Sequence, residues 1–110
     1  MLRQFEQFEC HDLPVEEITL SANGLRLIVT PYNESIAGYD NYCLELKGTF
    51  EYSLQGPFSS ESLEQLEVAT LKYHLLENGT ISGELGLLPG NDGYWTILFH
   101  SAMWKLQQVT

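Results

Sequence analysis

Residues 42–54 alternate between apolar and polar side chains, and this alternation constrains the fold more than any other feature of the sequence. Every even position except Gly48 is apolar, and the odd positions carry Cys43 and polar residues. A period of two places successive side chains on opposite faces of a β-strand. These residues therefore predict a long strand with a buried even face and a solvated odd face, and Gly48 predicts a bend or bulge in it.

Apolar segments separated by turn residues predict further strands. Residues 15–21 and 25–30 flank Ala22-Asn23-Gly24, and Asn-Gly between apolar segments is typical of a β-hairpin because both residues tolerate positive φ. Residues 94–106 read as a last strand. Trp95, Ile97 and Phe99 share one face before Ser101, and Ala102, Trp104 and Leu106 continue the apolar pattern with the parity switched, which predicts a β-bulge near Ser101.

The segment before the last strand allows two interpretations. Residues 62–65 fit a capping box, which predicts a short helix near 60–67. Residues 68–77 either extend this helix or form a strand that pairs with 80–88 through an Asn-Gly turn. The alternation from Leu71 to Leu75 favours the strand.

Together these elements predict an all-β fold. We expect residues 1–110 to form a single domain, a small antiparallel β-sandwich or partly open barrel of about six strands, with room for one short helix near 60–67. Such a sheet leaves edges that must be covered, and a homodimer that pairs sheet edges is one solution.

The chain is strongly acidic, since 5 Lys and Arg face 15 Asp and Glu and give a formal charge of −10. This charge repels phosphate and excludes nucleic acids and anionic membranes as favoured partners. It serves either solubility alone or attraction to a basic protein. Residues 1–8 lack the basic start and apolar stretch of a signal peptide, and no apolar segment approaches the roughly 18 residues of a membrane helix, so the expected location is the cytoplasm.

Candidate chemistry is sparse, and no catalytic, metal or cofactor site is predicted. Cys10, His11 and Asp12 are adjacent, so an extended chain turns His11 away from the other two and leaves too few ligands for a metal. The alternation places Cys43 on the polar face near Glu45, which raises the pKa of the thiol and argues against a nucleophile. We therefore expect a protein without enzymatic activity.

The candidate binding residues are aromatic or acidic. Tyr32, Tyr39 and Asp40 lie on the polar loop 31–41, and Glu16 and Glu17 add carboxylates on the first strand. Aromatic and acidic side chains on a loop are typical of a protein-binding patch, although loop packing is the other role that fits them. The sequence favours a protein-interaction domain for a basic partner. A small apolar-ligand binding protein and a small hydrolase remain alternatives.

Three stretches resemble short bacterial all-β families. They are HDLPVEEITLSANGLRLIV from His11 to Val29, the strand from Tyr42 to Tyr52, and W-x-I-x-F from Trp95 to Phe99. Some of these families look like the immunity proteins of bacterial toxin systems. The resemblance implies an all-β fold and, for the immunity type, the binding of a toxin, and it assigns no catalytic residue.

Overall fold

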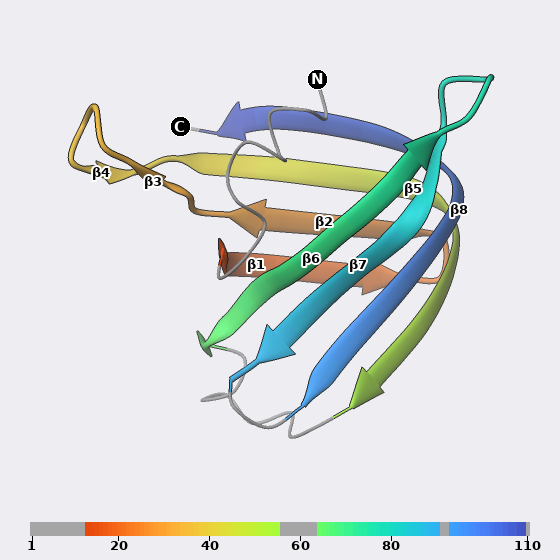
Figure 1. The fold of residues 1–110 in the computed structure, drawn as a ribbon, viewed down its shortest axis with the longest axis horizontal. Helices are drawn as coiled ribbons and strands as arrows, with labels where there is room; N and C mark the ends of the chain where they lie inside the picture. The colour runs from red at the N-terminus through yellow and green to blue at the C-terminus, as the bar shows by residue number, and fades with distance from the viewer. Residues whose placement is uncertain (1–12, 56–63, 91–92, 110) are drawn as a thin grey trace.

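A computed structural model describes residues 13–55, 64–90 and 93–109, which consist almost entirely of β-strands. Six long strands form one antiparallel sheet that closes into a ring in the order β1-β2-β5-β8-β7-β6 (Figure 1). A separate two-stranded sheet, β3–β4, lies between β2 and β5 in the chain. The strands are β1 (Leu13–Ser21), β2 (Gly24–Val29), β3 (Tyr32–Asn33), β4 (Gly38–Tyr39), β5 (Asn41–Gln55), β6 (Leu66–Leu75), β7 (Ile81–Pro89) and β8 (Tyr94–Val109). The all-β prediction is confirmed.

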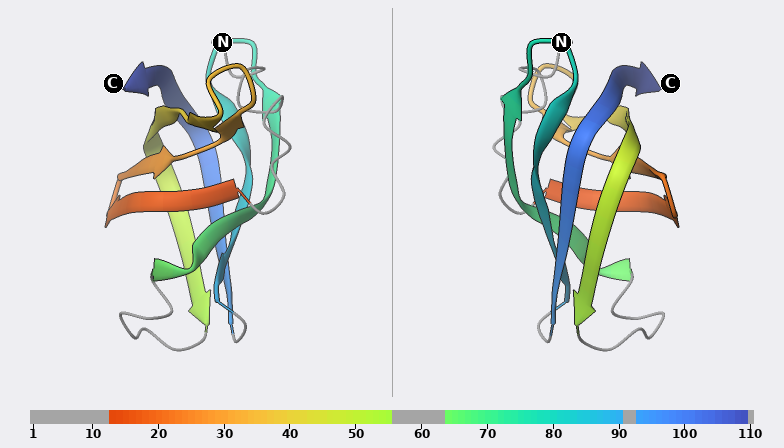
Figure 2. Two further views of the ribbon diagram at one scale, coloured as in Figure 1. Left: turned by 90° about the vertical axis from the view of Figure 1, so that its left-hand side faces the viewer. Right: turned by 90° about the vertical axis from the view of Figure 1, so that its right-hand side faces the viewer.

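The ring is uneven, because its neighbouring strands pair over very different lengths. β5 and β8 pair along the whole of β5, whereas β1 and β6 pair only at Leu13–Val68 and Pro14–Glu67. β1 runs in line with the first half of β5 (Figure 1) and crosses the second half of β5, the first half of β8 and β7 at a steep angle (Figure 2). The long β5–β8 pair therefore supports the sheet, and the short β1–β6 contact closes it.

The first hairpin is confirmed, but its turn differs from the predicted one. Ser21 pairs with Gly24, so the turn residues are Ala22 and Asn23. Positive φ is absent from both Asn23 and Gly24, so the expected reason for the Asn-Gly pair was wrong. The neighbouring strand β5 holds this turn instead, since Gly48 N donates a hydrogen bond to Asn23 O at 3.0 Å.

The predicted bulge in the last strand is confirmed at Ser101. The pairing of β5 with β8 shifts between Lys47 and Thr49, where β8 carries one extra residue. Ser101 has a φ of 50°, which is the left-handed region. A Cβ atom on Gly48 would lie 2.9 Å from the Cα of Ala102, so the two strands approach too closely for any larger residue. The bend predicted at Gly48 thus coincides with the bulge.

The hairpin interpretation of residues 68–77 is confirmed, and the helical one is wrong. β6 begins at Leu66 and pairs with β7 up to Leu75, and the turn contains Gly79 with a φ of 86°. Of the helix predicted near 60–67, residues 60–63 lie outside the described residues, and Glu64 has a helical conformation. Leu66 and Glu67 belong to β6, because pairing with β7 supplies their backbone hydrogen bonds.

The core fills the inside of the ring. On β5, Leu44 and Leu46 are fully buried, whereas Phe50 and Tyr52 are half-buried and pack against the core. The even face of β5 therefore points inward, as the alternation predicts. The buried apolar residues of this core are Leu13, Val15, Leu25, Leu27, Val29, Leu44, Leu46, Leu66, Val68, Ile81, Leu85, Leu87, Trp95, Ile97, Phe99 and Ala102.

Candidate functional site

Residues 31–40, which we call the arm, leave the ring between β2 and β5. The arm projects beyond the ends of these strands (Figure 1). Asp40 N donates a hydrogen bond to Pro31 O at 3.0 Å and closes the base of the arm, and Ala37 N donates to Glu34 O at 3.3 Å near its tip. Backbone pairing of β3 with β4 joins the two ends. The predicted polar loop is therefore a short, hydrogen-bonded hairpin.

Two tyrosines face each other across the arm. Tyr32 and Tyr39 are paired residues of β3 and β4, and their ring centroids lie 5.3 Å apart with an interplanar angle of 78°. The two residues are 57% and 63% exposed, and Ile36 near the tip is 61% exposed. The arm thus carries three large side chains that do not pack against the ring and are exposed to solvent.

The arm carries acidic side chains and lacks basic ones. Residues 31–40 contain Glu34 and Asp40 and neither Lys nor Arg. Glu34 is exposed, and Asp40 is half-buried at the base. Gln108 Nε2 donates a hydrogen bond to Asp40 Oδ1 at 3.3 Å and so connects the arm to β8. The local charge of the arm is therefore negative, as is that of the whole chain.

The other two predicted binding residues belong to a different element. A bulge between Val15 and Glu17 lets both Glu16 and Glu17 point away from the core, and both are exposed. They lie on β1 within the ring. The structure therefore brings Tyr32 and Tyr39 together, places Asp40 at the base of the same arm, and leaves the glutamate pair on a separate surface.

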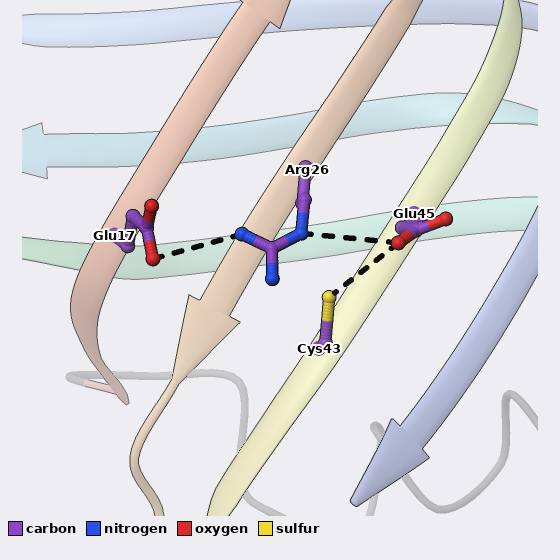
Figure 3. A network of polar contacts seen from close by, with 4 residues as sticks. All are labelled: Glu17, Arg26, Cys43 and Glu45. Carbon is purple, nitrogen blue, oxygen red and sulfur yellow. Dashed lines mark hydrogen bonds and ion pairs between the residues drawn. The ribbon is translucent and has the colours of Figure 1, made fainter. Parts of the chain in front are cut away.

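An ion-pair network that the sequence analysis did not predict lies on the outer face of β1, β2 and β5. Arg26 Nη1 is 3.6 Å from Glu17 Oε2, and Arg26 Nε is 3.8 Å from Glu45 Oε1 (Figure 3). All three side chains are partly exposed, so solvent screens these pairs and they add little stability. Only the register β1–β2–β5 reveals the network, because the three residues are far apart in the chain.

Cys43 departs from its predicted surroundings. Its position in the alternation is on the outer face, but it is only 2% exposed. Burial is the main cause of its raised pKa, with Arg26 opposing the shift and Glu45 adding to it. Cys43 Sγ lies 3.9 Å from Glu45 Oε1 (Figure 3). The predicted direction of the pKa shift is confirmed, and a protonated, covered thiol is a poor nucleophile.

Other kinds of site gain no support from the described residues. Within 13–55, 64–90 and 93–109, no cluster of three or more His, Cys, Asp or Glu side chains is arranged to hold a metal ion. Cys10, His11 and Asp12 lie outside the described residues. Nor does the described part of the chain contain a helix whose length and apolar character would let it cross a membrane.

Three open hollows lie on the outer face of the ring, and Lys47 lines each of them. Their volumes are about 240, 320 and 560 Å³. Arg26 and Glu45 line the smallest, and Met103 lines the other two. These hollows are surface depressions beside charged residues, which is not the enclosed apolar cavity that an apolar ligand requires.

No protein-family model, no curated protein and no solved structure matches the chain. The geometry of the arm is therefore the basis for assigning a function. Its exposed tyrosine pair is the most specific feature of the described surface.

Proposed function

We propose that the protein is a non-enzymatic interaction domain that binds a basic protein partner through its arm. One observation supports this proposal above the others. Tyr32, Ile36 and Tyr39 are all more than half exposed on one projecting acidic hairpin, although the same chain buries its core leucines completely.

The tyrosine pair suits a binding role on energetic grounds. Isolated exposed apolar residues are ordinary, but a cluster of aromatic side chains on a projection is typical of interfaces. Tyrosine has few rotatable bonds, and the edge-to-face contact of Tyr32 with Tyr39 already restricts both rings. Less side-chain entropy is then lost on binding. Packing against the closed sheet does not explain either tyrosine, because both side chains remain exposed.

The charge of the chain supports a basic partner. A formal charge of −10 creates a field that accelerates the approach of a positively charged surface. The proposed site of this encounter is the cytoplasm. An immunity-type role is a special case of the proposal in which the partner is a toxin, and the identity of the partner tests it.

Comparative capture tests the proposed function. Three immobilised proteins are exposed to native lysate: the wild type, the arm variant Tyr32→Ser/Tyr39→Ser, and Leu75→Ser. Leu75 is a matched control because it is 67% exposed but lies on β6. We expect mass spectrometry to identify a basic protein that the wild type and Leu75→Ser retain and the arm variant loses. Equal retention by all three would contradict the proposal.

Salt dependence then tests the electrostatic part. For the purified partner, we expect the association rate to fall markedly between about 50 and 500 mM salt, because ions screen the attraction. The dissociation rate should change less and should rise in Tyr39→Ser, which loses an aromatic side chain that the proposed interface would bury. An association rate that does not change with salt concentration would show that the charge plays no role in recognition.

A further inference from the structure

The tyrosine pair of the arm leaves negative ring faces open to solvent. In an edge-to-face pair, the positive edge of one ring points at the negative face of the other. The geometry of Tyr32 and Tyr39 is of this type, with an interplanar angle of 78°. At 57% and 63% exposure, both residues keep most of their surface accessible. Such a face attracts a cation within about 6 Å of the ring centre.

The chain's own described cations lie elsewhere. Arg26, Lys47, Lys72 and Lys105 are all on strands of the ring. Arg26 is also held between Glu17 and Glu45 on the outer face. None of these four described side chains lies on the arm.

The carboxylates of the arm complete the environment that a cation requires. Asp40 follows Tyr39 directly, and Glu34 lies two residues after Tyr32. Gln108 fixes the base of the arm through its hydrogen bond to Asp40. Ile36 offers an exposed apolar surface that the aliphatic stem of a long cationic side chain can contact.

We infer that the arm recognises an arginine side chain of the partner, with the guanidinium stacked on the Tyr32–Tyr39 pair. This inference rests on the proposed function and names the group that the site binds. Guanidinium is planar and weakly hydrated, so it stacks on aromatic rings and still donates hydrogen bonds to a carboxylate in its plane. An ammonium group is more strongly hydrated and lacks the flat surface, so lysine is the weaker ligand.

A peptide titration of the full chain tests the inference. The probes are three blocked five-residue peptides of Gly and Ser that differ only in a central arginine, lysine or citrulline. Citrulline keeps the planar shape but has no charge. Nuclear magnetic resonance follows the ring protons of Tyr32 and Tyr39. We expect the arginine peptide to shift them, the lysine peptide to bind at least about threefold more weakly, and the citrulline peptide to cause no shift.

Variants of Tyr39 show whether the peptide binds to the aromatic faces of the tyrosines. Tyr39→Phe keeps the face and should retain the affinity within about twofold, whereas Tyr39→Leu should abolish the shifts at Tyr32. Glu34→Gln, at an exposed carboxylate of the arm, should weaken binding, and Leu75→Ser should leave it unchanged. Equal shifts from all three peptides, or shifts that persist in Tyr39→Leu, would overturn the inference.

The two proposals fail in different ways. An arm-dependent partner that excess arginine peptide does not displace would leave the proposed function standing and overturn the arginine assignment. The opposite result is also possible: the arginine peptide binds the tyrosines, but the arm variant retains the same lysate proteins as the wild type. That result would overturn the proposed function, and the arm would still be an arginine-binding site.

Discussion

Large apolar side chains are mostly buried in the ring and mostly exposed in the arm. Leu27, Leu44 and Ile97 in the ring are 0% exposed, whereas Ile36 and Tyr39 in the arm are 61% and 63% exposed. In the ring, burial explains most apolar positions, with Leu75 and Met103 as exposed exceptions at 67% and 68%. Burial does not explain the exposed residues Ile36 and Tyr39, and the proposed contact with another molecule would.

The backbone shows the same contrast. A Cβ atom on Gly83 in the ring would overlap the carbonyl oxygen of Lys72 and lie 2.7 Å from the Cα of Tyr73. The nearest atom to a Cβ on Gly38 in the arm belongs to Ile36 and is 3.8 Å away. The ring is therefore intolerant of added volume at this point, and the arm has room for it.

Truncation of a core leucine should have the largest effect. Leu46→Ala removes a side chain that is 1% exposed, so we expect the free energy of unfolding to fall by about 2–5 kcal/mol. Ile36→Ala in the arm should change it by less than about 0.5 kcal/mol. Chemical denaturation measures both. Glu45→Ala, on the outer face beside Leu46, is the local control and should also cost under about 0.5 kcal/mol. If Leu46→Ala and Ile36→Ala lowered the free energy of unfolding by similar amounts, the arm would be packed as tightly as the core of the ring.

Added volume should have the next largest effect. Gly83→Ala forces β6 and β7 apart, and we expect a loss of about 1–3 kcal/mol in the free energy of unfolding. Gly38→Ala has space and no positive φ, so its effect should stay within about 0.5 kcal/mol or be slightly stabilising. Thermal melting of both variants compares the two regions directly. A destabilised Gly38→Ala would show that the arm is packed as tightly as the ring.

Removal of one hydroxyl group should have a smaller effect. The single proton of Tyr52 OH is shared between Ser21 O at 2.8 Å and Gly24 O at 3.1 Å, so this hydroxyl connects the β1–β2 turn to the C-terminal half of β5. Tyr52→Phe should therefore cost about 0.5–1.5 kcal/mol in the free energy of unfolding, measured by denaturation at neutral pH. An unchanged stability would mean that the turn holds its place without this contact.

The same hydroxyl group predicts a dependence on alkaline pH. Burial raises the pKa of Tyr52 above its ordinary value of 10.0 and that of Cys43 above 9.0. The folded state then holds these protons more tightly than the unfolded state. The stabilisation is fully present below the ordinary values and is lost as pH rises through the folded-state pKa values. Stability should fall above about pH 9, and the fall should be shallower in Tyr52→Phe. Parallel pH profiles would contradict this role.

The smallest effect on stability should come from the arm itself. Tyr32→Ser/Tyr39→Ser removes two exposed rings, so we expect the free energy of unfolding to change by under about 0.5 kcal/mol. Denaturation measures this, with Leu75→Ser as the control for loss of an exposed apolar side chain. A large loss would identify the tyrosine pair as a structural contact of the arm and sharpen the boundary between the two regions.

Local pattern alone was enough to predict much of the ring. The alternation of residues 42–54 determined which face of β5 points inward, and the change of parity in residues 94–106 located the bulge at Ser101. Both patterns are direct consequences of the two-residue period of a strand. The sequence also predicted Tyr32 and Tyr39 as binding residues, because aromatic side chains on a polar loop fit a binding patch, and this role stays a prediction.

Tertiary structure decided what depends on residues far apart in the chain. The register between strands placed Arg26 between Glu17 and Glu45, set the two tyrosines edge to face, and joined β1 to β6. Pairing with β7 made Leu66 and Glu67 part of a strand, and the fold buried Cys43 on a face that the alternation predicts to be exposed. Alternation fixes only the side of its own strand on which a residue lies. Which strands become neighbours follows from how the whole chain buries its apolar surface, and a local pattern does not contain that information.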